Sequence, residues 1–135
     1  MKRALAMANF APVTLTIEGL PCSKKTDQRQ IHAKGRVIPI PSAKYLSYER
    51  AACAQIARQF TGPPIDQRCH VGASFHRNDR TDVDNMLGGL LDILQKAKVL
   101  TNDRLVMSVA ATKSGKCDGN PRVEVVIEPF RKGES

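Results

Sequence analysis

Three aspartates in the second half of this 135-residue chain have the residue type and spacing needed to hold a divalent cation. Asp82 and Asp84 are one residue apart, and Asp103 follows a predicted helix. If residues 81–84 form the end of a strand, side chains two residues apart point the same way and the two acids converge. Magnesium takes oxygen ligands and is usually held by one or two protein carboxylates together with substrate phosphate oxygens. The pattern therefore favours a magnesium site.

The segment between the acids predicts an amphipathic helix from Asn85 to Lys98. At 100° per residue, its apolar face lies between about 140° and 240° from Asn85 and comprises Leu87, Leu90, Leu91, Leu94 and Lys98. The opposite, polar face comprises Asn85, Gly88, Gly89, Asp92 and Lys96. The N-terminus of such a helix would also favour a bound phosphate.

A purely structural interpretation of the acids stays open. Asp84 could cap the helix N-terminus, while Asp82 and Asp103 could occupy turns. Capping and metal binding by Asp84 are compatible, because one carboxylate oxygen can cap while the other contacts a metal. Three carboxylates gathered at one site would repel one another unless a cation or a proton relieved them.

The length of the predicted helix separates the acids. Fourteen residues span about 21 Å, and the five-residue link to Asp103 covers at most roughly 17 Å even when fully extended. A two-fold axis through the middle of the helix would let Asp103 of each chain meet Asp82 and Asp84 of the other. Two consecutive glycines would permit a close approach of the helices. The predicted homodimer interface on the polar face comprises Gly88, Gly89 and Asp92.

Several motifs resemble the RusA family of Holliday junction resolvases, which are small dimeric endonucleases of bacteria and their phages. The more specific part of the resemblance comprises D-V-D-N at Asp82–Asn85, Asp92, the helix end Gln95–Leu100 and N-D at Asn102–Asp103. Upstream, G-L-P-C-S-K-K-T at Gly19–Thr26 and P-S-A-K-Y-L-S-Y-E at Pro41–Glu49 look like the family's basic loop and first helix. Together these motifs cover most of the chain from Gly19 to about Glu128.

The resemblance implies a magnesium-dependent endodeoxyribonuclease that resolves four-way DNA junctions by paired nicks, in recombination and repair. Asp82, Asp84 and Asp103 match the family's catalytic, metal-binding acids, and Asn85 matches a residue linked to DNA contact. The family's catalytic lysine, one turn into the helix, is replaced here by Gly88. For the nuclease, Lys96 on the same face is the candidate substitute cation. The alternative function is a non-enzymatic or weakly active junction-binding protein.

The charge distribution fits a protein that binds a polyanion. The formal net charge is +8, and residues 1–80 carry 13 basic and 5 acidic side chains, against eight of each in residues 81–135. A basic first half followed by an acid cluster fits DNA bound beside a metal site. For Lys24 and Lys25, the alternative interpretation is a solvated basic loop that does not contact DNA. The candidate DNA contacts are Lys24, Lys25, Arg36, Arg77, Arg80 and Asn85. The absence of Trp argues against base stacking as the main mode of binding.

The four cysteines lack the close-spaced ligand pairs of structural zinc sites. Cys53 and Cys69 are expected to be small core residues of a reduced protein. The N-terminal apolar run is too short for a signal peptide, and no segment approaches transmembrane length. A soluble, cytoplasmic protein without membrane association is expected.

Hydrophobic periodicity predicts an α/β (α+β) single domain, with two helices packed on a mixed four- to five-stranded sheet. The expected strands are 12–18, 36–40, 67–75, 105–111 and 123–127, and the expected helices are 43–60, behind an N-cap at Ser42, and 85–98. The remainder of 19–41 is expected to be irregular. The nuclease domain is expected over residues 12–130, between a flexible N-terminus (1–11) and a disordered tail (131–135).

Overall fold

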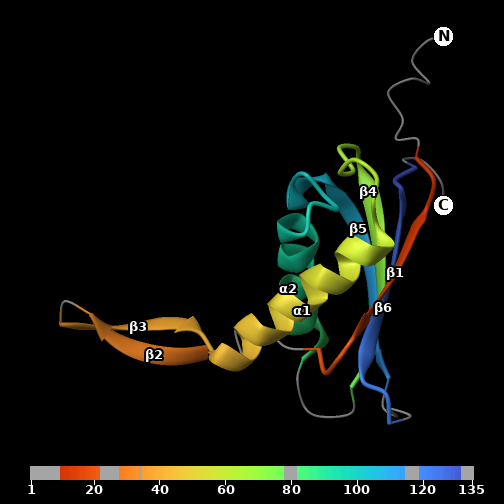
Figure 1. The fold of residues 1–135 in the computed structure, drawn as a ribbon. Coiled ribbons are helices and arrows are strands. Elements are labelled where there is room, and N and C mark those ends of the chain that lie inside the picture. The colour runs from red at the N-terminus through yellow and green to blue at the C-terminus, as the bar shows by residue number, and fades with distance from the viewer. Residues whose placement is uncertain (1–9, 22–27, 34, 78–81, 115–118, 132–135) are drawn as a thin grey trace.

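A four-stranded mixed sheet with both helices on one face forms the body of the protein (Figure 1). The computed structural model describes residues 10–21, 28–33, 35–77, 82–114 and 119–131, so the expected flexible ends lie largely outside the described residues. The sheet comprises β1 (Val13–Glu18), β4 (Cys69–His76), β5 (Val106–Ser114) and β6 (Arg122–Pro129), in the order β1-β6-β4-β5. The helices are α1 (Ala43–Gln59) and α2 (Val83–Lys96). The predicted fold class is confirmed.

Side chains alternate between the two faces of the sheet, as the period of two along a strand requires. In β4 and β6 every second residue is buried against the helices. The central part of the core comprises Leu15, Ile17, Val71, Phe75, Val123, Val125 and Ile127. The opposite face carries smaller and polar residues, among them His70, Ser74 and Glu124. No helix in the described part of the chain is long and apolar enough to cross a membrane.

The parallel pairing of β4 and β5 determines where α2 must lie. Parallel neighbours cannot be joined by a hairpin, so the chain needs a crossover, and α2 supplies it. Cys69 pairs with Val106, and His76 pairs with Ser114, so the two strands begin at one end of the sheet and finish at the other. The segment before α2 therefore lies at one end of β5, and the segment after α2 lies at the other.

The helix α2 begins at Val83, two residues earlier than expected, and its buried face is rotated from the predicted one. The buried residues are Met86, Gly89, Leu90, Ile93 and Leu94, whereas Leu87 and Leu91 are only half-buried. The reason is that α2 is covered from two directions, by the sheet beneath and by α1 beside it. Because α2 packs against both the sheet and α1, its buried face is wider than the one predicted from the spacing of its leucines.

Residues 28–41 form a hairpin rather than an irregular loop. Strand β2 (Gln28–Ala33) pairs with β3 (Arg36–Pro41) in antiparallel register around Gly35, whose φ of 74° suits glycine. The hairpin projects from the body of the protein (Figure 1). Two prolines are tolerated in β3, because both strands of a two-stranded ribbon are edge strands.

The outer edge of β1 is protected by two side-chain amides from α1. Gln59 accepts from the N–H of Thr16 at 2.9 Å and donates to its carbonyl at 2.7 Å. Gln55 does the same for Glu18, at 2.7 Å and 3.0 Å. Because the glutamines lie one helical turn apart, they satisfy the strand edge as a further strand would.

We expect the double substitution Gln55→Ala with Gln59→Ala to lower the free energy of unfolding by about 1–2 kcal/mol, since four exposed hydrogen bonds are lost. Urea denaturation measures the change. Arg50→Ala, on an exposed position of the same helix, is the control and should stay within about 0.5 kcal/mol of wild type. A double mutant as stable as the control would show that the amides contribute nothing.

Candidate functional site

Asp82 and Asp84 lie together at the N-terminus of α2, both exposed. Asp82 is the N-cap residue, with extended backbone, and its carboxylate makes no capping hydrogen bond. Asp84 lies in the first turn, where its Oδ1 accepts from the N–H of Asn85 at 3.0 Å. The expectation that a strand end aligns these acids is wrong, because the helix begins at Val83 and places them at its N-cap and in its first turn instead.

The position of this carboxylate pair suits a cation that is shared with a phosphate. The free N–H groups and the dipole of a helix N-terminus attract anions, including phosphate. Two carboxylates beside a phosphate would crowd negative charge unless a cation relieved it. The carboxylate of Asp82 is exposed and not used for capping, so its oxygens suit a hard cation such as Mg2+.

Asp103 lies at the other end of α2. It begins a short 3-10 helix, Asp103–Leu105, which Asn102 caps by accepting from the N–H of Arg104 at 2.8 Å. The N–H of Asp103 donates to Oε1 of Gln95 at 3.0 Å, which fixes the acid beside the last turn of α2. Gln95 was not identified as a site residue from the sequence, because nothing in its spacing marks it as a support for a later loop.

The three acids do not meet within one chain. Thirteen residues separate Asp82 from Gln95, which corresponds to roughly 20 Å along the helix axis. Within the described residues, no group of three His, Cys, Asp or Glu side chains is placed to hold a metal ion. The separation expected from the helix length is therefore present in the structure.

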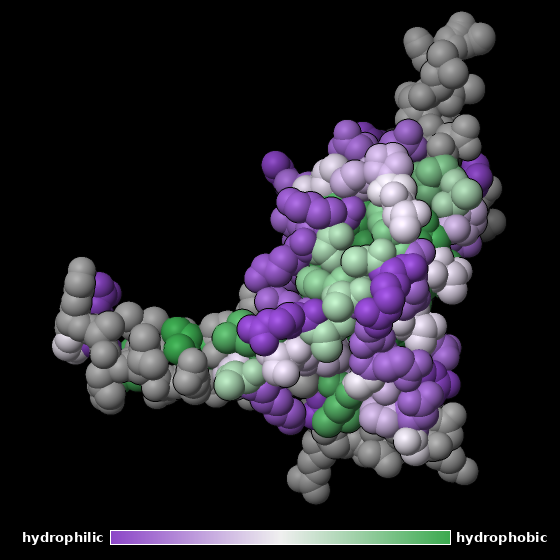
Figure 2. Space-filling model, viewed as in Figure 1, coloured by the Kyte–Doolittle hydropathy of each residue, from purple (hydrophilic) through white to green (hydrophobic). Residues whose placement is uncertain are grey.

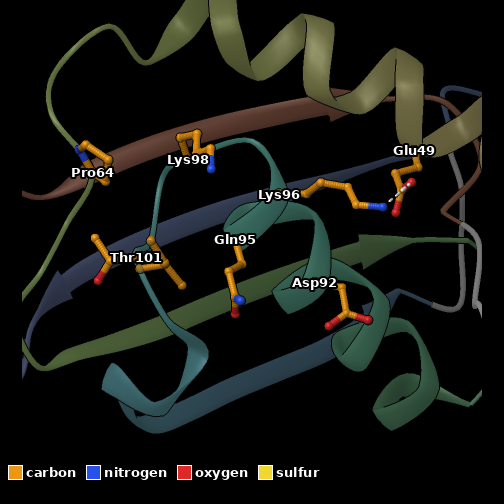
Figure 3. Close-up of a pocket in the computed structure, with 8 residues that line it drawn as sticks. Glu49, Pro64, Asp92, Gln95, Lys96, Lys98 and Thr101 are labelled. Atoms are coloured by element: carbon orange, nitrogen blue, oxygen red, sulfur yellow. Dashed lines mark hydrogen bonds and ion pairs between the residues drawn. The ribbon is translucent and has the colours of Figure 1, made fainter.

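A pocket of about 610 Å³ adjoins the end of α2 that carries Gln95 (Figure 3). Lys96 reaches across it toward α1, and its Nζ lies 3.1 Å from Oε1 of Glu49. Glu49 is only 7% exposed, so this ion pair neutralises a carboxylate that the fold has largely removed from water. Lys96 is therefore held toward α1 and away from the carboxylates at the start of α2.

The three predicted interface residues have different surroundings. Gly88 is exposed, and a Cβ added there would meet no atom within 4 Å. Asp92 is also exposed and lines the pocket. Gly89 is buried within its own chain, so its assignment to a dimer interface is wrong, because α2 turns this position inward.

The candidate DNA contacts are only partly described. Arg36 is exposed at the start of β3, and Asn85 is half-buried in the first turn of α2. Arg77 is 6% exposed and donates from Nη1 to the carbonyl of Pro21, so it suits an anchor for the 10–21 segment better than a DNA contact. Lys24, Lys25 and Arg80 lie outside the described residues. Figure 2 shows mostly polar side chains around a smaller apolar area on the helix-bearing side.

The described cysteines and histidines do not offer an alternative catalytic group. Burial raises the pKa of the Cys69 thiol, and burial followed by the Glu49 carboxylate raises that of Cys53, so neither is activated as a thiolate. Both pack in or against the core, as expected. His70 and His76 lie on the sheet face away from the helices, where Nδ1 of His70 is 2.7 Å from Oγ of Ser108.

Comparison with known proteins identifies the family of this chain. A family model described as Endodeoxyribonuclease RusA matches residues 20–128. The chain is also 31% identical, over 127 residues, to a protein of Aquifex aeolicus (strain VF5) named Crossover junction endodeoxyribonuclease RusA. That alignment covers 93% of this chain and 98% of the Aquifex protein. This chain belongs to the RusA family of endodeoxyribonucleases.

Proposed function

We propose that this protein is a magnesium-dependent nuclease that resolves four-way DNA junctions by paired nicks, as a cytoplasmic homodimer acting in recombination and repair. The observation that carries the proposal is the pair of exposed carboxylates, Asp82 and Asp84, at the N-terminus of α2. The family match supplies the class of reaction, and the name of the Aquifex relative supports the junction as substrate.

In this proposal each metal site is shared between two chains. Asp82 and Asp84 of one chain and Asp103 of its partner hold the Mg2+, because Asp103 is fixed beside Gln95 at the far end of its own α2. A divalent cation held by these acids would supply Lewis-acid activation of the scissile phosphate and of the attacking water. The start of α2 contributes its N–H groups and partial positive charge to orienting the phosphate.

The β2–β3 hairpin is proposed as a DNA-binding arm. Its sequence contains Arg29, Lys34 and Arg36 but no acidic residue. A two-stranded hairpin standing alone is at best marginally stable in water, so a partner that lies along it would stabilise it. The major groove of B-DNA admits a two-stranded ribbon, and the basic residues would contact phosphates.

Gly88 supports a second candidate function, a junction-binding protein without efficient cleavage. The lysine that the family carries at this position is absent, and Lys96 is engaged by the largely buried Glu49. No second described lysine on α2 is available to replace it. Both candidates bind junctions, and only the first cuts them in a metal-dependent reaction.

Mixing inactive chains tests the shared site. Asp82→Asn and Asp103→Asn should each abolish nicking of a four-way junction while binding is retained, because a ligand is lost and repulsion of phosphate is relieved. A mixed dimer keeps one site with all three acids, so mixing should restore nicking to about a quarter of wild type, because half of randomly paired dimers are mixed and each has one complete site of two. Nicking of a labelled junction measures this, with linear duplex as the substrate control.

If the three acids belonged to one chain, every site in a mixed dimer would be damaged. No recovery of nicking after confirmed subunit exchange would therefore contradict the shared site. Wild-type nicking by either single mutant would contradict the metal assignment itself, and no metal-dependent nicking by the wild-type chain would favour the binding-only function.

We expect Gly88→Lys to raise the nicking rate at least several-fold. The exposed position accepts a side chain without a clash, and replacing a helix-interior glycine favours the helix by up to about 1 kcal/mol. The lysine would lie one turn from Asp84, where it can stabilise charge that develops on the phosphate. Gly88→Gln is the matched control, since it adds a side chain of similar reach without the charge.

Equal rates for the lysine and glutamine variants would show that position 88 no longer contributes to catalysis.

The variant Lys96→Ala tests whether Lys96 serves catalysis as a substitute cation or serves only the ion pair with Glu49. Because it leaves Glu49 buried without its partner, it should lower the free energy of unfolding by about 1–3 kcal/mol, with junction nicking per folded molecule unchanged.

Arg36→Ala should weaken binding to junction and duplex alike. Loss of one phosphate contact should reduce the slope of log K against log salt by about 0.9. Arg58→Ala, at the exposed C-terminal turn of α1, is the control and should leave the slope unchanged. An Arg36→Ala slope identical to wild type would return this arginine to a solvated surface role.

A further inference from the structure

A second pocket, of about 520 Å³, opens on the sheet face that the helices leave uncovered. It lies where β1 begins and β6 ends, so both ends of the described chain contribute to it (Figure 1). None of the three aspartates of the candidate site lines this pocket. The side chains that determine its chemistry are Phe10, His70, Ser108, Glu128, Phe130 and Arg131.

Three polar side chains of the pocket stand in a row across the sheet. Glu128 of β6 and Ser108 of β5 are the direct neighbours of His70, one on each side. Because adjacent strands are about 4.8 Å apart, the row spans roughly 10 Å. Nδ1 of His70 lies 2.7 Å from Oγ of Ser108. Nε2 is therefore the ring nitrogen that is left for a ligand.

An irregularity in β5 creates this row. The pairing passes from Cys69 with Val106 directly to His70 with Ser108, so Met107 is an extra residue in β5. Without it, Met107 and not Ser108 would stand beside His70. An extra residue is rare in a parallel pair, and such bulges often lie next to functional sites, where they redirect a side chain. The backbone of β5 is thus adapted to the pocket.

The rest of the lining supplies two aromatic rings and two opposite charges. Phe10 and Phe130 are half-buried, whereas Glu128 and Arg131 are exposed. Within the described ranges, neither Glu128 nor Arg131 forms an ion pair or a side-chain hydrogen bond. Both charges are therefore available to a molecule in the pocket.

This combination of groups narrows the class of ligand. A metal ion is disfavoured, because no group of three suitable ligands occurs among the described residues. Inorganic phosphate would leave most of the pocket empty and would meet the carboxylate of Glu128. An apolar molecule would leave polar groups without partners. A flat ring that carries N–H donors and is joined to a phosphate would use all of these groups.

We infer that this pocket binds a nucleoside monophosphate, either free or as an unpaired nucleotide of a DNA strand. The base packs on the phenylalanine rings and donates an amino N–H to Glu128, since carboxylates accept from such groups on bases. The phosphate accepts from Arg131 and from Nε2 of His70. The volume lies within the range of about 300–1,000 Å³ that is usual for small-molecule sites. The inference concerns binding alone and does not require the proposed cleavage.

An unpaired nucleotide held in this pocket would lie near one of the acids. Asp103 precedes Ser108 by five residues, so their Cα atoms are at most roughly 18 Å apart. The phosphates that adjoin the captured nucleotide would be kept on this end of the sheet. A fully paired duplex offers no such base, so the pocket would recognise a break in base pairing.

A titration of the full chain with the four deoxynucleoside monophosphates tests the pocket. Amide resonances of His70, Ser108 and Phe130 should shift and saturate in two-dimensional NMR spectra. dAMP, dGMP and dCMP should bind several-fold more tightly than dTMP, because thymine has no amino group and its one N–H lies between two carbonyls. No shift with any nucleotide, or equal shifts with inorganic phosphate alone, would overturn the inference.

Two exposed positions test the roles of the charged groups. Glu128→Gln should abolish the discrimination against dTMP, because an amide can also donate to a carbonyl. Arg131→Ala should weaken binding of all four nucleotides by about three- to tenfold, through loss of a charged hydrogen bond. Glu18→Gln and Arg58→Ala, exposed and outside the pocket, are the charge-matched controls. An unchanged order of bases for Glu128→Gln, or equal weakening by the controls, contradicts the assignment.

A DNA duplex with one unpaired nucleotide, compared with its fully paired counterpart, identifies the source of the ligand. Shifts of the pocket amides with the unpaired duplex place a DNA nucleotide in the pocket, whereas shifts with mononucleotides alone identify a free nucleotide. Equal shifts with the fully paired duplex would overturn recognition of an unpaired base. Nicking assays separate the inference from the proposed function. Nucleotide binding without nicking contradicts the nuclease, and nicking without nucleotide binding contradicts the pocket.

Discussion

The parallel pairing of β4 with β5 is the constraint on which the rest of the structure depends. Because parallel neighbours need a crossover, a helix must run the length of the sheet between them. The carboxylates at the start of that helix and the carboxylate after it are consequently held at opposite ends of β5. Local changes in the loops cannot bring them together without breaking the strand pairing, and this is why the proposed metal site is shared with a second chain.

Much of the fold could be predicted, because the strands alternate cleanly and the sheet is covered on one face only. Two parts of the fold were not predicted: the buried face of α2, which packs against two neighbours, and the hairpin that lies outside the main sheet. Gly89 and Ile93 of α2 are buried in a helix that contacts α1 as well as the sheet, and the period of one helix does not reveal a second neighbour. The β2–β3 hairpin forms a two-stranded sheet separate from the four-stranded one, so no pairing with the other predicted strands indicated it.

In the candidate site, too, some features were predictable from the sequence and others were not. The spacing of Asp82 and Asp84 in the sequence predicted one site for the two acids, and the helix start rather than a strand end positions them. The supporting residues were not predictable, because Gln95 acts on a backbone N–H eight residues away and Glu49 acts across two helices. Arg77 was assigned to DNA by its charge, whereas its guanidinium binds the Pro21 carbonyl inside the fold. Charge alone does not distinguish a surface cation from a structural one.

Symmetry connects the separated acids to the proposed reaction. If one site needs acids from two chains, the two-fold axis that completes the first site completes the second, and neither exists in a lone chain. The two strands to be cut in a four-way junction are themselves related by two-fold symmetry. A dimer built this way would present two equivalent sites to two equivalent strands, each with all three acids. The fold would thereby couple cleavage to dimer formation, and single chains bound to duplex DNA would leave it intact.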